Sequence, residues 1–328
     1  MSGADGVTPE LRAPSIKGAL RFWWRAMNGH LSLTELKKVE GEIFGDTGHR
    51  SKVIIREELE NDNYKLLHYD GRSENSLLPH KGGSIAKCFP VNELSKFRIN
   101  LCLVKDVKVI LSTGEDYNFN HNNLCDLFKL ICVLGGLGKR SRRGFGSIKI
   151  NQTKLNGGDW EVFNMPQSVD EILELLGNQF SKNGDIINSI FNRRSFNFKD
   201  DYPYIKSIEI GETDSNITKK IIFDSHLVKD KEYDRAEQIA IDRNDYKTFF
   251  NTRTNKQDSK PNSIRYSNFE NAIGNGSRFA SPIFVSTIQT SGGLKSIITT
   301  LKAVPSGRFD EHIHGVLQTE YKNKLKNI

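Results

Sequence analysis

A glycine-rich, strongly basic turn between an apolar helix and a strand constrains this chain most. Residues 135–147 read GGLGKRSRRGFGS and contain no acidic residue. The cations of this turn are Lys139, Arg140, Arg142 and Arg143. Its glycines, which allow a positive φ and a close approach of a phosphate to the backbone, are Gly135, Gly136, Gly138, Gly144 and Gly146. The turn therefore predicts a polyanion site, with nucleic acid as the first ligand to consider.

The spacing of this turn excludes the two common mononucleotide motifs. A Walker loop needs a Ser or Thr after its Gly-Lys pair, but Arg140 follows Gly138-Lys139. A dinucleotide fingerprint follows a strand and opens a helix. Here the expected helix comes first, with Leu124, Leu127, Phe128, Ile131 and Leu134 at helical spacing, and an expected strand at 145–150 follows. This order favours the phosphates of a nucleic-acid chain, and a solvated charge run in a helix-to-strand turn is the alternative.

The basic excess of the chain is concentrated around this turn. The formal net charge is +7, and residues 127–158 carry seven Lys or Arg and no Asp or Glu. Such a cluster is the electrostatic pattern of a nucleic-acid-binding surface. At 328 residues the chain can form two domains of ordinary size. The sequence shows neither an apolar run of bilayer length nor a secretory signal pattern, so we expect a cytoplasmic protein without a membrane partner.

The cysteines and histidines give little indication of a metal or a catalytic centre. Cys88, Cys102, Cys125 and Cys132 lack C-x-x-C spacing, so neither a zinc site nor a disulfide framework is indicated and no cofactor is expected. His49 stands in a GDTGHRSK turn, and His312 and His314 flank one residue near the end. General acid–base catalysis needs a second group within reach. We therefore expect that this chain is not an enzyme.

A second informative segment is LRAPSIKGALRFWWRAMNG, residues 11–29. Ser15 is the expected N-cap and Gly29 the expected stop of a helix of about 13 residues. Its core stripe is predicted to contain Ile16, Leu20, Trp23 and Met27, opposite a cationic flank of Lys17, Arg21 and Arg25. Trp24 lies between the two, where it serves either as a stacking platform for a base or as an edge of the core. Phe22 points away from the stripe and is expected to be exposed.

Four segments carry a family resemblance. They are PELRAPSIKGALRFWWRA, EGEIFGDTGHRSKVIIRE, GLGKRSRRGFGS and, late in the chain, GSRFASPIFV. In this order they resemble the RAMP proteins of CRISPR systems, and most of all the family of Cmr subunit one in the type III-B effector complex. The resemblance extends over most of the chain.

The resemblance implies an α+β fold of two ferredoxin-like, RRM-related domains in tandem. It further implies a non-catalytic subunit of a ribonucleoprotein that contacts other Cmr subunits, the 3′ region of a guide RNA and a target RNA. The family's glycine-rich loop corresponds to Gly138 through Gly146, and its basic helix to Lys17, Arg21 and Arg25. In the family a strand normally precedes the segment that matches SGADG. Because the sequence starts at Met1 within that segment, the first domain is expected to lack its opening strand or to receive it from a neighbour.

The rest of the sequence predicts the domain organisation. The expected elements are a helix at 33–45, with Leu33, Leu36, Val39 and Ile43 inward, strands at 51–56 and 99–104, a helix at 168–181, and strands at 204–210, 283–289 and 294–303. Residues 59–87 are expected to be an insertion with a hairpin or a mobile loop, and 251–277 a long exposed loop. A polar stretch at 151–168 is the predicted boundary, so the domains are residues 1–155 and 156–328. The turn before residue 283 echoes the basic loop, which makes Arg278 a candidate RNA contact.

Three classes of function remain open at this point. The first is a structural RNA-binding subunit, which the resemblance favours. The second is a RAMP endoribonuclease that processes guide RNA with a histidine as general acid or base. The third is a protein-interaction scaffold whose basic loop contacts acidic protein.

Overall fold

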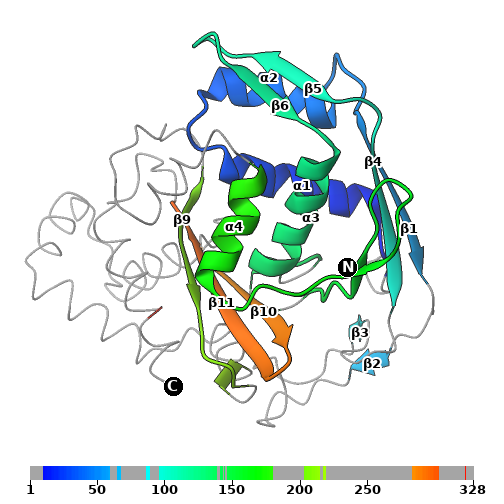
Figure 1. Ribbon diagram of the computed structural model, residues 1–328, viewed down its shortest axis with the longest axis vertical. Helices are drawn as coiled ribbons and strands as arrows, with labels where there is room; N and C mark the ends of the chain where they lie inside the picture. Colours follow the sequence, from blue (N-terminus) through cyan, green and yellow to red (C-terminus); the bar gives the residue numbers. More distant parts are fainter. Residues whose placement is uncertain are drawn as a thin grey trace, which may run out of the picture.

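The computed structural model describes residues 10–59, 65–67, 86–88, 96–138, 141, 142, 144, 146–179, 203–214, 217, 218, 283–302 and 322. It combines helices with small antiparallel sheets (Figure 1), so the expected α+β class is confirmed. The polar stretch 251–277 and the first nine residues lie outside the described residues.

The first helix, α1, runs from Ala13 to Met27. It begins earlier than predicted: Arg12 is the N-cap, and its side chain makes no capping hydrogen bond. The prediction of Ser15 as N-cap was wrong because Pro14 fits the first turn of a helix, where its missing N–H has no partner to lose. The C-cap is Asn28, whose N–H donates to the carbonyl of Arg25. This cap lies one residue before Gly29, the predicted stop.

The two tryptophans of α1 both lie in the core. Trp23 is 2% exposed, as predicted, and Trp24 is 0% exposed. The Trp24 Nε1 donates to the Tyr117 hydroxyl at 3.0 Å, and that hydroxyl donates to the Asn28 Oδ1 at 3.1 Å. A base cannot reach a ring that is fully covered, so the stacking role considered for Trp24 is wrong in this structure. The core role, which also satisfies its indole N–H, is the one it takes.

Helix α2 spans Leu33–Phe44 and opens with a capping box formed by Ser32 and Glu35. Its predicted inner face is confirmed at Leu36, Val39 and Ile43. Leu33 is 39% exposed, so its assignment to that face was wrong. Strands β5 (Val107–Ile110) and β6 (Asp116–Phe119) pair antiparallel, and the turn between them donates the N–H of Ser112 to Glu35 at 2.9 Å.

Strands β1 (Val53–Leu59) and β4 (Phe97–Leu103) form a two-stranded antiparallel sheet in which Arg56 stands opposite Asn100. Both strands agree with the sequence prediction. Within the predicted insertion, β2 (Lys65–Leu67) pairs with β3 (Ala86–Cys88), which confirms the hairpin alternative for these residues. The remaining residues of the insertion lie outside the described part of the chain.

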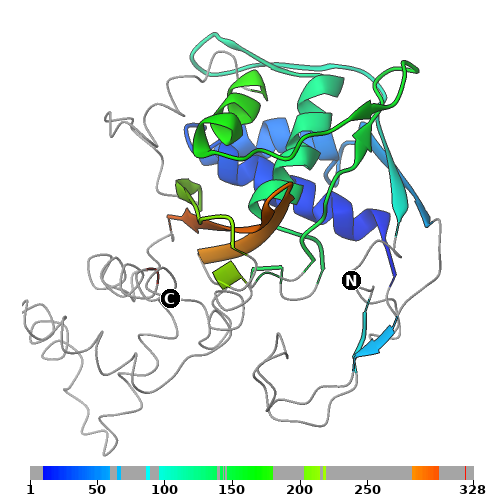
Figure 2. The ribbon, with the colours of Figure 1, turned by 60° about the horizontal axis from the view of Figure 1, so that its bottom comes forward.

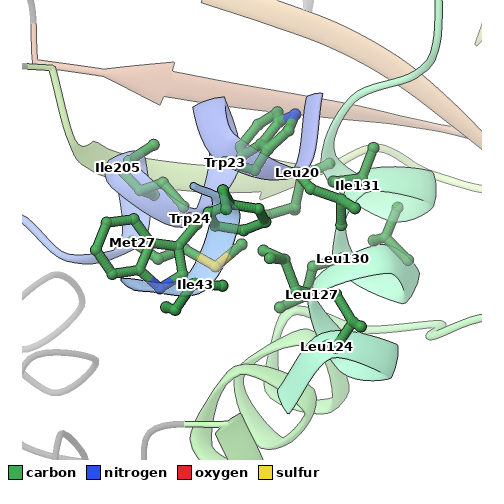
Figure 3. Close-up of a cluster of buried hydrophobic side chains, with 14 of the residues drawn as sticks. Leu20, Trp23, Trp24, Met27, Ile43, Leu124, Leu127, Leu130, Ile131 and Ile205 are labelled. Atoms are coloured by element: carbon green, nitrogen blue, oxygen red, sulfur yellow. The ribbon is translucent and has the colours of Figure 1, made fainter. Parts of the chain in front are cut away.

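Helix α3, His121–Leu134, packs against α1 at the centre of the molecule. Figure 3 shows Leu20, Trp23 and Trp24 of α1 beside Leu124, Leu127, Leu130 and Ile131 of α3, with Ile205 of β9 at the edge of the cluster. The predicted spacing of apolar residues in α3 is confirmed. Phe128 is only partly buried.

The strand predicted at 145–150 does not form over residues 146–150, and residue 145 lies outside the described residues. Residues 147–150 have no regular structure, although Ile148 and Ile150 pack on the core. The chain forms its hairpin later, where β7 (Gln152–Thr153) pairs with β8 (Glu161–Val162). A β-branched run alone does not make a strand, because a strand needs a neighbouring backbone to bond with.

The last elements form a helix and a three-stranded sheet. They are α4 (Val169–Gln179), β9 (Ile205–Ile210), β10 (Ile283–Thr290) and β11 (Gly293–Leu301), with strand order β10-β11-β9. All four agree with predicted elements to within a few residues. Figures 1 and 2 show this sheet lying against α1, α3 and α4.

Hydroxyl groups of this sheet bind the end of α3. Ser286 donates to the carbonyl of Val133 at 2.7 Å, and Thr299 donates to that of Leu134 at 3.5 Å. The last carbonyls of a helix have no partner within the helix, so these buried bonds satisfy them. One hydrophobic cluster consequently includes Trp23 of α1, Leu134 of α3 and Phe284 of β10.

Candidate nucleic-acid interface

The basic loop is closed at a narrow neck. The N–H of Leu137 donates to the carbonyl of Gly146 at 2.9 Å. Gly138, Gly144 and Gly146 have φ values of 95°, 80° and 72°, the left-handed region that favours glycine. A Cβ on Gly146 would lie 2.0 Å from the carbonyl oxygen of Leu137, so this glycine is required to close the loop.

The loop is bound to the edge of the C-terminal sheet. The N–H of Gly144 donates to the carbonyl of Val285 at 2.7 Å, and the N–H of Val285 donates to the carbonyl of Arg142 at 3.1 Å. The N–H of Thr287 donates to the Ser147 hydroxyl at 3.2 Å. These bonds cover part of the outer edge of β10 and fix the loop on a rigid support.

Arg142 lies over an aromatic floor. Its guanidinium carbon is 4.8 Å from the ring centroid of Phe284 and 5.5 Å from that of Phe22. The two rings are 5.6 Å apart, and Trp23 is 5.1 Å from Phe284. Phe22 is therefore partly buried beneath the loop, and the prediction that it is exposed was wrong. Both Phe22 and Phe284 lie too far along the chain from Arg142 for periodicity to have shown this contact.

Two of the predicted loop glycines serve packing instead of ligand approach. Gly135 is buried, and a Cβ there would come within 2.8 Å of the Trp23 indole. Gly136 is also buried. The remaining predicted cations of the loop, Lys139, Arg140 and Arg143, and the candidate contact Arg278 lie outside the described residues.

The cationic flank of α1 is held by one carboxylate of α2. The Glu40 Oε1 accepts from the Arg21 Nε at 2.6 Å and from Arg25 at 2.9 Å. The side chain of Glu40 is 7% exposed, whereas that of Arg21 is 35% exposed. Arg21 also donates to the carbonyl of Gly45 at 3.3 Å. Arg21 on the predicted cationic flank is therefore ion-paired, because a nearly buried acid on α2 faces it.

Lys17 stands at the N-terminal end of this flank. Burial lowers the pKa of Lys17, and the nearby positive charge of Arg21 lowers it further. With Glu40 ionised, the three cations and one carboxylate leave two positive charges on this face. The flank therefore keeps a positive potential, with less charge than three free cations would give.

Next to this flank, the GDTGHRSK turn is organised around Asp46. The Asp46 Oδ1 accepts from the N–H groups of Gly48 and His49 at 2.8 Å and lies 2.9 Å from the His49 Nδ1. The backbone bond from Gly48 is the largest cause that lowers the pKa of Asp46. The His49 Nε2 lies 3.8 Å from Glu42, which also binds Lys52. His49 is thus placed between two carboxylates that position its ring.

One exposed feature was missed by the sequence analysis. Trp160, in the stretch predicted to be a domain boundary, is 47% exposed, and the guanidinium carbon of Arg98 lies 5.3 Å from its ring centroid. The overlooked signal was the Asn156-Gly157 pair, which is typical of a hairpin turn. Both residues have positive φ, 48° and 79°.

Neither metal binding nor membrane insertion is indicated by the described residues. Among them, no group of three or more His, Cys, Asp or Glu side chains is placed to hold a metal ion. Likewise, no helix in the described ranges is both long and apolar enough to cross a bilayer.

Comparisons with known proteins agree with the resemblance read from the sequence. Residues 2–149 match the model of the RAMP superfamily. The chain is 33% identical over 195 residues to the CRISPR system Cmr subunit Cmr1-1 of Pyrococcus furiosus, a match covering 55% of this chain and 52% of that relative. It is 27% identical over 168 residues to Cmr1-2 of the same organism, covering 47% of this chain and 90% of the relative.

The chain is also similar to solved structures of Cmr proteins, at lower sequence identity than to the two curated relatives. The crystal structure of Cmr1 from Pyrococcus furiosus in the apo form shares 17% identity with a TM-score of 0.45, covering 96% of this chain and 90% of that one. A chain in the cryo-EM structure of the type III-B Cmr-beta complex bound to cognate target RNA and AMPPnP shares 12% identity with a TM-score of 0.49, covering 99% and 97%.

Residues 2–149 of the chain are therefore similar to the RAMP superfamily. Its curated relatives are Cmr1 subunits of CRISPR systems, and the resemblance inferred from the four sequence segments is confirmed. The aligned region spans about half the length of Cmr1-1.

Proposed function

We propose that this chain is a non-catalytic RNA-binding subunit of a type III-B CRISPR (Cmr) ribonucleoprotein. In this proposal it contacts the 3′ region of a guide RNA and the target RNA, and it binds neighbouring Cmr subunits. The names of its curated relatives support the assembly, since both are Cmr subunits. The two predicted ferredoxin-like domains, 1–155 and 156–328, are part of the same proposal.

The observation that carries the proposal is the basic loop closed by Leu137 and Gly146. Its described backbone is held at the neck by the bond between Leu137 and Gly146, and on β10 by the bonds of Arg142 and Gly144 with Val285. Arg142 is positioned in this loop over the rings of Phe284 and Phe22. Lys139, Arg140 and Arg143 add three positive charges to the same loop sequence, which favours a phosphate ligand.

The α1 flank is the second part of the proposed interface. Phe22 of α1 lies under Arg142, so α1 supports the loop on one side and carries Lys17, Arg21 and Arg25 on another. Charge without base-reading side chains favours phosphate contacts, which position RNA but do not read its sequence. We infer that guide and target bases are read by pairing with each other and not by this loop.

A salt titration of RNA binding tests the proposal. Arg142→Ala combined with Arg143→Ala should weaken binding to unrelated single-stranded RNAs by similar factors, and should reduce the slope of log K against log salt by roughly two at most. A matched control replaces two exposed lysines outside both segments, Lys105 and Lys206, and should leave the slope nearly unchanged. A loss of affinity for one RNA sequence only would contradict phosphate binding.

The runner-up function, an endoribonuclease, is favoured by one observation, the contact of His49 with Asp46 at 2.9 Å. A carboxylate that orients an imidazole is a common arrangement for general acid–base catalysis. Against it, the second ring nitrogen of His49 faces Glu42. Incubation with labelled RNA and a chelator separates the classes. We expect binding without cleavage, whereas cleavage that His49→Ala abolishes would establish the nuclease, and no binding at low salt would favour a protein scaffold.

A further inference from the structure

The β7–β8 hairpin presents a surface that the proposed function does not use. Gln152 stands opposite Val162, and Thr153 opposite Glu161. Continued by one step, this register places Lys154 opposite Trp160. Because side chains of opposite residues project to the same side of a ribbon, one side of the hairpin carries Gln152, Lys154, Trp160 and Val162, all of which are exposed. We call this side the Trp160 face.

Trp160 differs from the other two tryptophans of the chain. Trp23 and Trp24 are buried in the core, whereas about half of Trp160 is open to solvent. Large aromatic rings exposed to solvent near other apolar side chains often mark a contact site for another molecule. Leu155 and Val162 on the same hairpin are also exposed, so the hairpin is a local concentration of uncovered apolar groups.

The ring of Trp160 is nevertheless held in place. The guanidinium carbon of Arg98 on β4 lies 5.3 Å from the ring centroid, and the Arg98 Nη1 lies 3.6 Å from the Glu58 Oε2 on β1. Figures 1 and 2 show the hairpin beside β1 and β4. Its base is anchored by the N–H of Phe163, which donates to the carbonyl of Asn151 at 3.0 Å, and by the packing of the Phe163 ring on the core.

The two sides of the hairpin differ in charge. Lys154 stands on the Trp160 face, and Arg98 contacts the ring. Asp159 and Glu161 flank Trp160 in the sequence, but Glu161 stands opposite Thr153 and so projects to the other side of the ribbon. An aromatic ring flanked by cations is the arrangement on which unpaired nucleic-acid bases stack, since the ring binds the base and the cations bind its phosphates.

We propose that Trp160 is a stacking platform for an unpaired RNA base, with Lys154 beside it for the adjoining phosphate. This inference rests on the proposed function and adds a base contact to an interface otherwise made of phosphate contacts. Arg98 acts as a positioning residue, because it holds the ring and does not itself need to touch the RNA. Stacking tolerates any base, so the site adds affinity for single strands without reading sequence.

The test measures binding of the full chain to three probes: a fluorescent single-stranded adenosine oligoribonucleotide, an abasic oligomer of the same length and charge, and an RNA duplex. Trp160→Ala should weaken binding to the adenosine strand by about five-fold to a hundred-fold. Trp160→Ala should change the affinity for the abasic oligomer and for the duplex by no more than about two-fold. Trp160→Phe should recover most of the affinity, and Val162→Ala, on the same face, is the matched control without an aromatic change.

Intrinsic fluorescence gives an independent readout of the same contact. Trp160 is the exposed tryptophan among the three, so the adenosine strand should quench the long-wavelength part of the emission. That quenching should be absent in Trp160→Phe and unchanged in Val162→Ala.

The outcomes distinguish the two proposals. If the unmodified chain binds none of the probes, the proposed function fails and the stacking site with it. If it binds RNA and Trp160→Ala binds the adenosine strand equally well, only the stacking site is overturned. The stacking site is also overturned if Trp160→Ala weakens binding to the abasic oligomer as much as binding to the adenosine strand. It is likewise overturned if Trp160→Ala leaves RNA binding unchanged and abolishes association with another Cmr subunit.

Discussion

The two cationic segments of this protein, the α1 flank and the loop closed by Leu137 and Gly146, are both rich in Lys and Arg, but different groups face their arginines. On α1, Arg21 and Arg25 share the nearly buried carboxylate of Glu40. In the loop, Arg142 lies over the rings of Phe284 and Phe22. An ion pair reduces the charge that a ligand experiences, whereas an aromatic face attracts the cation without cancelling its charge.

This difference separates a structural role of the arginines from a role in RNA binding, which the number of basic residues alone does not distinguish. The arginines of α1 join α1 to α2, so they contribute to the fold and leave a reduced positive potential for RNA. Arg142 lies over two aromatic rings in the basic loop, where the proposed function assigns it a phosphate contact. Substitutions in the α1 flank should therefore act first on stability, and substitutions in the loop first on RNA binding.

The largest effect is expected at the aromatic floor beneath the loop. Trp23→Ala should lower the free energy of unfolding by roughly 3–5 kcal/mol, because the indole packs on Gly135 and on the rings of Phe22 and Phe284. Urea denaturation followed by far-UV circular dichroism measures the loss. Leu33→Ala, at an exposed position on α2, should change it by no more than about 0.5 kcal/mol. Similar losses for the two variants would refute the packing around Trp23.

A smaller but still large effect is expected in the α1 flank. Arg21→Glu should lower the free energy of unfolding by about 2–3 kcal/mol, because it places a second carboxylate beside Glu40. This loss is smaller than that expected for a fully buried ion pair, because Arg21 is partly exposed and solvent screens its charge. Thermal unfolding measures this, with Lys37→Glu on the exposed side of α2 as control. An unchanged melting temperature in Arg21→Glu would show that Glu40 does not hold the arginines in solution, and the comparison between the two segments would fail.

The effect of Arg142→Gln on stability should be modest. Loss of the contacts with Phe284 and Phe22 should cost about 0.5–1 kcal/mol. The same variant should reduce the salt dependence of RNA binding by about one unit of slope, and Arg142→Lys should restore most of that slope. A stability loss as large as that of Arg21→Glu, without a change in RNA binding, would make Arg142 a purely structural residue.

The smallest effect concerns the ionisation of Lys17. Its pKa should lie below 10.5 in the folded protein, because burial disfavours the ammonium and the charge of Arg21 repels it. Because the pKa of Lys17 is lower in the folded protein, the unfolded chain binds the ammonium proton of Lys17 more tightly. At a pH below the folded pKa, the charged Lys17 therefore lowers the free energy of unfolding. This loss of stability disappears as the pH rises through the folded pKa to 10.5. An NMR titration of the Lys17 side chain measures the pKa. In Arg21→Gln the value should rise partway, and a pKa of 10.5 or higher in the unmodified protein would contradict the burial of Lys17.

Local sequence patterns determined most of the regular elements. The apolar spacing within α1, α2 and α3 repeats every three to four residues, and a helix depends on neighbours at that distance. β9, β10 and β11 were predicted from continuous segments rich in β-branched and other apolar residues, which are also a local pattern. The family resemblance was also recognised from short segments, because PELRAPSIKGALRFWWRA and GLGKRSRRGFGS are each continuous in the chain.

What only the tertiary structure decided are contacts between residues far apart in the chain. Trp24 bonds to Tyr117, 93 positions away, and so belongs to the core. Glu40 meets Arg21 from a neighbouring helix, and Phe284 meets Arg142 from the C-terminal sheet. Residues 147–150, part of an expected strand, have no regular structure, while Trp160 was placed against Arg98 by a hairpin in the stretch expected to be a domain boundary. A sequence specifies charge and periodicity locally, but which carboxylate, ring or backbone faces a side chain depends on how the elements pack.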